Sequence, residues 1–289
     1  MAHARPSHDP LPSTPHAVSM RMRARWMLLA LLPGAALVAW FRRDPSPWEW
    51  LGAALLLVFC FAHYRAPAQR QRDLSPLLRF ALVVLWLPPA TPWWTFALAM
   101  FAIVAIEWLF ADRPAANPFH PTMIACALVL VCLPVAPSAS PSSGAVASSA
   151  WIALAWALGG IALLAARCIR WQAPLALLAG AAIVFAAWGA TDPSLPADPV
   201  LRSLLPSLVL TAFFIADDPP RTGMQPRARL FCGFLAGGIA TATMLDLHML
   251  HRDGQLPLAL AGTMLAMSAA APTLDRLFAS PRATMGASA

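Results

Sequence analysis

Residues 117–133 read NPFHPTMIACALVLVCL and contain the pattern that decides the fold. Pro118 and Pro121 stand where a helix begins, because proline donates no N–H and is tolerated in a first helical turn but disrupts a helix deeper in. Asn117 can cap the unpaired backbone donors of that turn. From Pro121 onward every residue except Thr122 is apolar. The stretch predicts a membrane helix that begins at a polar, proline-rich mouth.

A second stretch of this kind lies in the other half of the chain, where residues 213–230 read FFIADDPPRTGMQPRARL. Here an apolar run ends at Asp217 and Asp218, and two prolines follow. Both stretches join an apolar run to a polar, proline-rich segment. We expect the remaining helices to be arranged around these two.

The composition is that of an all-α polytopic membrane protein. Of the 289 residues 59% are hydrophobic and only 11% are charged, whereas a soluble protein carries about 25% charged residues. The arginines lie singly or in small groups between apolar runs, as in cytoplasmic loops. No basic groove interleaved with aromatic residues is present in the sequence, so the high positive charge does not indicate nucleic-acid binding.

Apolar runs between proline, glycine and charged residues predict about ten transmembrane helices. They fall at 24–41, 47–64, 74–88, 92–111, 119–135, 149–166, 173–190, 201–216, 228–246 and 257–275. The third and the eighth are short and end in proline clusters, and interrupted segments at matching positions of two halves indicate a transporter-type inverted repeat. Because each half holds five helices, the second half must be inverted relative to the first.

The predicted organisation has five parts. They are a disordered N-terminal tail (1–20), a first five-helix repeat (21–135), a short extracytoplasmic loop (136–148), a second five-helix repeat (149–278) and a C-terminal tail (279–289). With the N-terminus inside, the inner segments hold 16 of the 20 arginines and the outer segments hold 4. The positive-inside rule therefore places both termini in the cytoplasm.

Four motifs in the same order resemble a known family. They are DLSPLLRFALVVLWLPPATPWW (73–94), NPFHPTMIACALVL (117–130), FFIADDPPRTGMQPRARLFCG (213–233) and LDRL (274–277). The family comprises the RnfD component of the Rnf electron-transport complex and the NqrB component of the sodium-translocating NADH:quinone oxidoreductase, and the resemblance covers roughly residues 25–278.

The resemblance implies a component of an ion-translocating oxidoreductase in the bacterial inner membrane. Such a component has ten helices in two inverted repeats, binds flavin, and passes electrons among other membrane subunits of a redox complex. This transfer is often coupled to Na+ or H+ movement.

The chain departs from the family at the flavin attachment motif. The family esterifies flavin mononucleotide to the threonine of an S-G-A-T motif, and this chain has Ser143, Gly144, Ala145 and Val146 there. Val146 has no hydroxyl, so we expect no covalent flavin. The cofactors that remain as candidates are a non-covalent flavin (FMN or riboflavin) and a quinone. A separate extracytoplasmic flavin-bearing protein could also dock at the short loop.

Other hydroxyls lie near this position, on Ser142, Ser143, Ser148 and Ser149. Each is an alternative acceptor in principle. A plain connecting loop is the simpler interpretation.

Three residues at the start of the predicted helix 119–135 are candidate cofactor ligands: Asn117, His120 and Thr122. A helix N-terminus offers backbone N–H groups and a dipole that favour an anionic or electron-rich group, such as a flavin carbonyl, a quinone oxygen or a phosphate. His120 could also supply a proton. The alternative is that Asn117 only caps the helix and His120 faces cytoplasmic water.

Acidic residues at membrane depth are further candidates. Asp217 and Asp218 could bond a flavin ring N–H, coordinate a cation or relay a proton, because such groups are costly unless paired or hydrated. The alternative is an ordinary salt bridge to an arginine, the candidates being Arg221, Arg227 and Arg229. Glu107 together with Asp218 could form an ion path, or Glu107 could simply pair with Arg113.

Two further patterns have simpler interpretations. Asp246, His248 and His251 could suggest a metal site, although the two histidines lack a further ligand cluster and solvent exposure is the simpler expectation. Gly233, Gly237 and Gly238 form a GxxxGG face, which predicts close helix packing, although the flat face of a flavin also needs small neighbours.

Three functions from different classes compete. The first is a redox component that holds flavin or quinone. The second is a small-solute or ion transporter or channel, because inverted repeats with interrupted helices are transporter architecture. The third is a scaffold without cofactors that only assembles a complex. A co-purifying chromophore would favour the first, and solute flux without a redox partner would favour the second.

Overall fold

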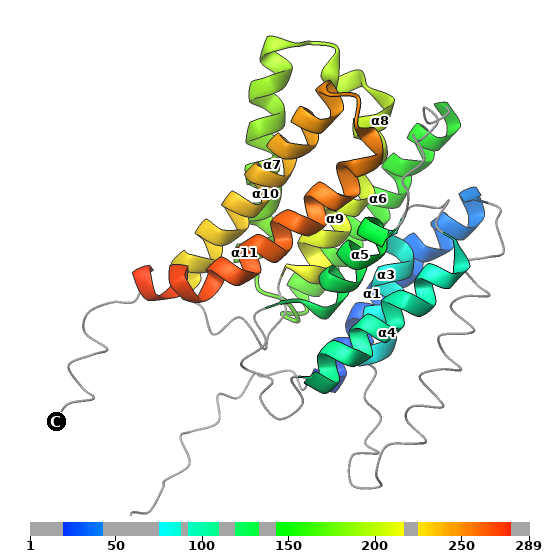
Figure 1. Ribbon diagram of the computed structural model, residues 1–289, viewed down its shortest axis with the longest axis vertical. Helices are drawn as coiled ribbons and strands as arrows, with labels where there is room; N and C mark the ends of the chain where they lie inside the picture. The colour runs from blue at the N-terminus through cyan, green and yellow to red at the C-terminus, as the bar shows by residue number, and fades with distance from the viewer. Residues whose placement is uncertain are drawn as a thin grey trace, which may run out of the picture.

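The computed structural model describes residues 20–42, 75–87, 92–109, 119–132, 143–216 and 225–278, and within these ranges the chain is helical with short turns and no strand. Figure 1 shows the arrangement. The longer helices are α1 (Met20–Arg42), α3 (Ser75–Trp86), α4 (Trp93–Leu109), α5 (Pro121–Cys132), α6 (Ser143–Ala165), α7 (Gln172–Thr191), α10 (Pro226–Met249) and α11 (Leu256–Phe278). The shorter elements are η3 (Leu195–Ala197), α8 (Pro199–Ser203), α9 (Leu205–Leu210), the π turn η4 (Thr211–Ile215) and η6 (Asp253–Gln255).

Nine of the ten predicted helices fall in the described ranges, and each is present there. The predicted helix 47–64 lies outside them, as do residues 1–19 and 279–289 of the two predicted tails. The largest difference in a boundary is at α6, which begins at Ser143, so residues 143–148 of the predicted outer loop are helical. The small residues of this segment, SGAVAS, continue the helix backward because none of them is a proline that would stop it.

The five long helices have the length and composition to cross a membrane: α1, α6, α7, α10 and α11. Their outer faces expose large apolar side chains, among them Leu29, Leu32, Leu158 and Ile183. An exposed apolar surface of this extent is expected where lipid, and not water, is the solvent. The described chain is therefore a multi-pass membrane protein.

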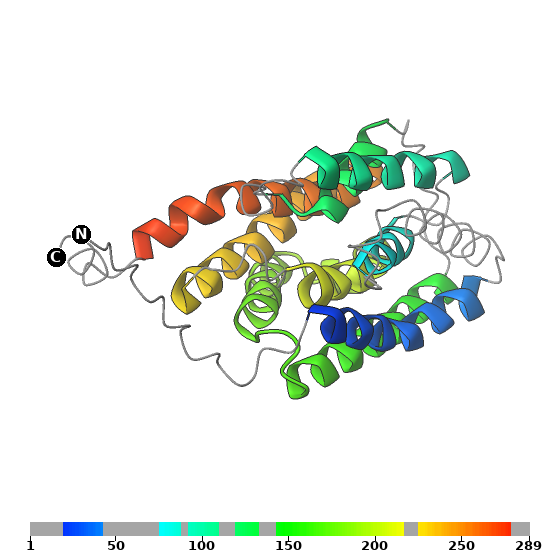
Figure 2. The same cartoon turned by 90° about the horizontal axis from the view of Figure 1, so that it is seen from below.

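Two of the shorter segments, α3 and the π turn η4, lie in the interior of the helix bundle. In α3, Leu82 and Val83 are fully buried, as is Leu87 directly after the helix, and every residue of the π turn η4 is buried. A helix that is apolar all round belongs in an interior. Figure 2, the view from below, places α3 and α9 between a layer with α4, α5 and α11 and a layer with α1 and α6. The short helix α3 and the irregular turn η4 are thus enclosed by protein, where irregular backbone is tolerated.

Helices α1 and α6 pack antiparallel through glycines. Gly159 lies against the carbonyl of Ala30, and Gly34 lies against the indole of Trp156, so the two chains run in opposite directions along the contact. Successive spans alternate in direction, and antiparallel packing therefore needs an even number of spans between α1 and α6. The four predicted helices between them meet this requirement.

Helices α7 and α10 pack parallel and at close range. A methyl group on Gly233 would lie 2.8 Å from the carbonyl oxygen of Ala173, Gly237 lies against the carbonyl of Leu177, and Gly180 against that of Phe234. The close packing that the glycine face predicts is confirmed. Parallel directions also require an odd number of spans between these helices, which the single broken segment from α8 to η4 supplies.

Substituting Gly237 with alanine tests this contact. We expect Gly237→Ala to lower the free energy of unfolding by about 1–3 kcal/mol, because the added methyl group forces the two backbones apart. Gly262→Ala in α11 is the matched control, since nothing lies within 4 Å of its added carbon, and alanine there gains about 0.5–1 kcal/mol of helix stability. Thermal unfolding in one detergent measures both, and equal effects would contradict the close contact.

Candidate functional site

The first turn of α5 places two of the candidate ligands in the interior. The backbone N–H of Ile124 donates to the carbonyl oxygen of His120 at 3.1 Å, so His120 occupies the N-cap position. The side chain of His120 is only 8% exposed and Thr122 is 0% exposed. The expectation that His120 faces water is therefore wrong. Asn117, three residues before the N-cap, lies outside the described residues.

Thr122 carries a polar atom that the described residues leave unsatisfied. Its Oγ1 is buried and has no hydrogen-bond partner among them. The first turn of a helix also holds backbone N–H groups without intrahelical partners, and the helix dipole adds positive potential there. Since α5 packs against α3, α4 and α11, this group of donors lies at a helix start inside the bundle.

The second candidate stretch follows a broken helix. Asp198 caps α8 through its side chain, which accepts from the N–H groups of Val200 and Leu201 at 2.8 and 3.2 Å. The chain then passes through α9 into the π turn, where the N–H of Ala216 donates to the carbonyl oxygen of Thr211 at 2.9 Å. Single π turns inside helices occur frequently at functional sites. The turn ends two residues before Asp217, which with Asp218 lies outside the described residues.

A side-chain hydrogen bond ties this π turn to α3. The indole Nε1–H of Trp86 donates to Thr211 Oγ1 at 3.0 Å, and the Thr211 hydroxyl donates to the carbonyl oxygen of Ser207 at 2.7 Å. The two residues are 125 positions apart. This pair was not predicted from the sequence, where the available signal was a threonine within a largely apolar run.

The arginines proposed as partners for the two aspartates differ in position. Arg227 is exposed, whereas Arg229 is 2% exposed on the face of α10 that packs on α7. Arg221 lies outside the described residues. Arg229 precedes Gly233 by four residues, so extending the glycine face one turn backward would have indicated its burial.

The remaining candidates lie at helix ends. Glu107 is in the last turn of α4, and Arg113 lies outside the described residues. Val146 falls in the first turn of α6 together with Ser143, Gly144 and Ala145. Residues 143–146, which stand where the family carries its flavin attachment motif, are thus part of a helix and not a plain loop.

The histidine near the end of α10 has two aspartate partners. His248 Nδ1 lies 2.7 Å from Asp253 Oδ1, and its Nε2 lies 3.3 Å from Asp198 Oδ2. These partners are neither Asp246 nor His251. Among the described residues no group of three or more histidine, cysteine or acidic side chains could hold a metal ion. His248 therefore joins the cap of α8 to the end of α10.

These features define a class: a multi-pass helical membrane protein with short, broken helices buried at its centre. The chain belongs to the NQR2, RnfD, RnfE family, which matches residues 8–150 and 139–283. It is 28% identical to the RnfD component of the ion-translocating oxidoreductase complex of Vibrio cholerae serotype O1, covering 91% of this chain and 95% of that protein. The protein of the same name from Pseudomonas aeruginosa is also 28% identical, covering 92% and 93% of the two chains.

The relatives carry residues that have no counterpart here. The alignment with the Vibrio cholerae protein extends over 342 residues, more than the 289 of this chain. The two family matches meet at 139–150, the stretch where α6 begins.

Replacing the hydroxyl of Thr211 tests the link to α3. We expect Thr211→Val to lower the free energy of unfolding by about 1–3 kcal/mol, because it leaves the buried Trp86 N–H without an acceptor. Thr263→Val in α11 is the matched control, since that hydroxyl bonds only to the carbonyl oxygen of Ala259. In a Trp86→Phe background the Thr211→Val cost should shrink toward that of the control. A cost that stays unchanged in that background would contradict the coupling.

Proposed function

We propose that this protein is an integral membrane electron-transfer component of an Rnf/Nqr-like ion-translocating oxidoreductase complex in the bacterial inner membrane, with both termini cytoplasmic. Family membership supports this proposal, as do the relatives named as parts of an ion-translocating oxidoreductase complex, which align with nine-tenths of the chain. The arginine distribution of the sequence supports the orientation. Other membrane subunits of the complex are the partners.

The buried start of α5 is the observation that supports a cofactor site. The unpartnered Thr122 hydroxyl and the first-turn N–H groups are hydrogen-bond donors in the interior, and flavin and quinone carbonyl oxygens are acceptors. Asn117, His120 and Thr122 would hold such a group, with Asp217 and Asp218 accepting from a flavin ring N–H. A bound flavin supplies reversible electron transfer in one- and two-electron steps.

His120 has a chemical role in this proposal. Imidazole exchanges a proton near neutral pH, and His120 is buried directly before the first turn of α5. It would hold or release the proton that accompanies reduction of a bound flavin or quinone. Glu107 and Asp218 are the proposed ion path for Na+ or H+.

The flavin is proposed to be non-covalent, as FMN or riboflavin. Val146 lacks the hydroxyl that a phosphoester requires, and the relatives carry residues that this chain does not. We propose that a separate extracytoplasmic flavin-bearing protein docks at the segment before α6. Such a partner would replace the covalent carrier that this chain lacks.

The contacts between helices support two inverted repeats. The first helices of the two predicted halves pack together as α1 and α6, and α5 packs on α11, which pairs the last helices. The third and eighth predicted helices meet at the bond from Trp86 to Thr211. Two inverted repeats are related by a two-fold axis in the membrane plane. Such an axis is expected to bring corresponding helices of the two halves into contact and to make α1 and α6 antiparallel.

A transporter or channel is the second candidate function. The break between α8 and α9 and the π turn that follows support a transport function. In transporters, interrupted helices place the charged ends of helix dipoles at the substrate site inside the membrane. Solute or ion flux into liposomes without any redox partner would favour this candidate. A cofactor-free scaffold would show neither flux nor a chromophore.

An absorption spectrum before and after denaturation and filtration tests the redox proposal. We expect a flavin band that passes entirely into the filtrate, because no residue anchors it covalently. A band retained on the protein would contradict non-covalent binding, and the absence of any flavin or quinone would contradict the redox proposal.

A substitution of Thr122 tests whether the proposed flavin or quinone site lies at the start of α5. Thr122→Val should lower the amount of flavin or quinone that co-purifies by about fivefold or more, as expected for the loss of one buried hydrogen bond of about 1 kcal/mol. Thr243→Val is the control, because that exposed hydroxyl bonds only within α10. Equal occupancy in both variants would place the cofactor elsewhere.

A further inference from the structure

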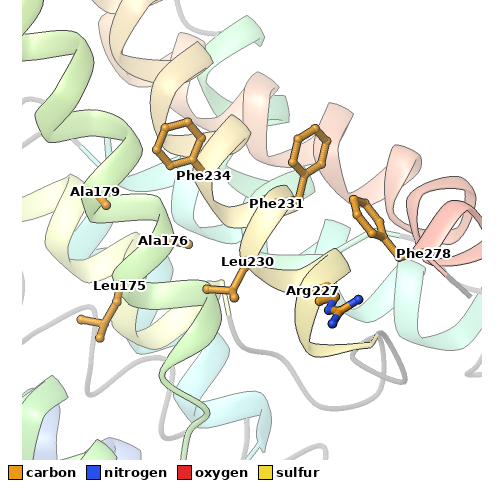
Figure 3. Close-up of a pocket in the computed structure, with 8 residues that line it drawn as sticks. All are labelled: Leu175, Ala176, Ala179, Arg227, Leu230, Phe231, Phe234 and Phe278. Carbon is orange, nitrogen blue, oxygen red and sulfur yellow. The ribbon is translucent and has the colours of Figure 1, made fainter. Parts of the chain in front are cut away.

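An open groove of about 640 Å³ lies between α7, α10 and α11. Figure 3 shows Arg227 at the start of α10, Phe231 and Phe234 farther along the same helix, and Phe278 at the end of α11. Leu175 of α7 forms the opposite wall. Arg227 is the charged residue of this lining, and the rest of the lining is apolar.

The groove has a charged residue at one end and apolar side chains along the rest of its length. Positions 227, 231 and 234 share one face of α10, and seven residues of helix extend roughly 10 Å. Phe231 and Phe278 are 5.6 Å apart between ring centroids, and Phe231 and Phe234 remain 43% and 40% exposed. The groove is therefore an open apolar strip with a cation at one end.

The end of the molecule that holds Arg227 is basic. Both α7 and α10 begin there, so two helix dipoles point their positive ends at the groove. The charged residues in the described segments that flank these helix starts and in the last turn of α11 are Arg167, Arg170, Arg227, Arg229, Arg276 and Asp275. The single carboxylate among them, Asp275, accepts the backbone N–H of Gln225 at 2.7 Å, which fixes the end of α11 to the start of α10.

The opposite end of these helices is acidic. There the charged residues are Asp192, Asp198, Asp246, Asp253, Arg202 and Arg252. The groove thus opens at the basic membrane face, and basic pockets between membrane helices on the cytoplasmic side bind anionic headgroups.

We infer that this groove is a binding site for an anionic phospholipid, whose phosphate contacts Arg227 and whose acyl chain lies along Phe231 and Phe234. The combination of a terminal cation and an apolar strip matches a charged headgroup followed by a hydrocarbon chain. A neutral quinone has no charge to pair with the guanidinium. None of the groove residues belongs to the proposed cofactor site at α5, so the inference stands apart from the proposed function.

Native mass spectrometry of the full chain with equal amounts of phosphatidylglycerol and phosphatidylcholine tests the inference. We expect the protein to retain phosphatidylglycerol preferentially, and Arg227→Gln to lower that preference about fivefold, the effect of one arginine near an anionic lipid surface. Arg227→Lys should keep most of the preference because it keeps the charge. Arg252→Gln, at the acidic end, is the matched control and should leave the preference unchanged.

Further measurements distinguish other occupants. Thermal unfolding in phosphatidylcholine alone confirms that the Arg227→Gln variant is folded. Glycerol 3-phosphate, which lacks acyl chains, should not displace the lipid, and displacement would show a simple anion site instead. A headgroup preference that survives Arg227→Gln, a quinone retained in the groove, or cross-linking of Phe234→Cys to a partner helix in the intact complex would overturn the inference.

Discussion

The buried hydrogen bond between Trp86 and Thr211 joins the short helix α3 to the broken segment from α8 to η4. A break or an early helix end that faced lipid would leave backbone groups unsatisfied at a cost of several kcal/mol each. The long helices must therefore enclose them. The arrangement of α1, α6, α10 and α11 around the centre follows from this need to keep broken helices away from lipid.

The apolar runs of the sequence predicted the helices because proline and charged residues separate them clearly. The start of α6 was misplaced, since Ser143–Ser148 has the composition of a loop and yet contains no residue that prevents a helix. The break between α8 and α9 was not predicted, because it falls inside the single helix expected at 201–216, and the proline cluster that was expected to end this helix lies outside the described residues. The π turn at Thr211 was not predicted either, because the sequence TAFFI is equally compatible with an ordinary helix and the extra residue in the turn depends on tertiary packing.

The candidate site was predicted only where one residue contrasts with its neighbours. Thr122 is the polar residue of an apolar run, and the structure buries it, while its role as a cofactor ligand stays a prediction. The burial of His120 and Arg229 depends on which helices cover them, and no local pattern contains that information. The partnership of Trp86 and Thr211 likewise required the fold, because 125 residues separate them.

Helices α7 and α10 touch backbone to backbone at Gly180, Gly233 and Gly237, where a glycine of one helix meets a carbonyl oxygen of the other. We therefore expect the two helices to move as one rigid pair when the surrounding bilayer changes. A lone membrane helix adjusts to a thinner or thicker hydrocarbon layer by tilting, but here a tilt moves both helices together. Because the π turn packs on α7, we expect a tilt of this helix pair to shift the buried π turn as well.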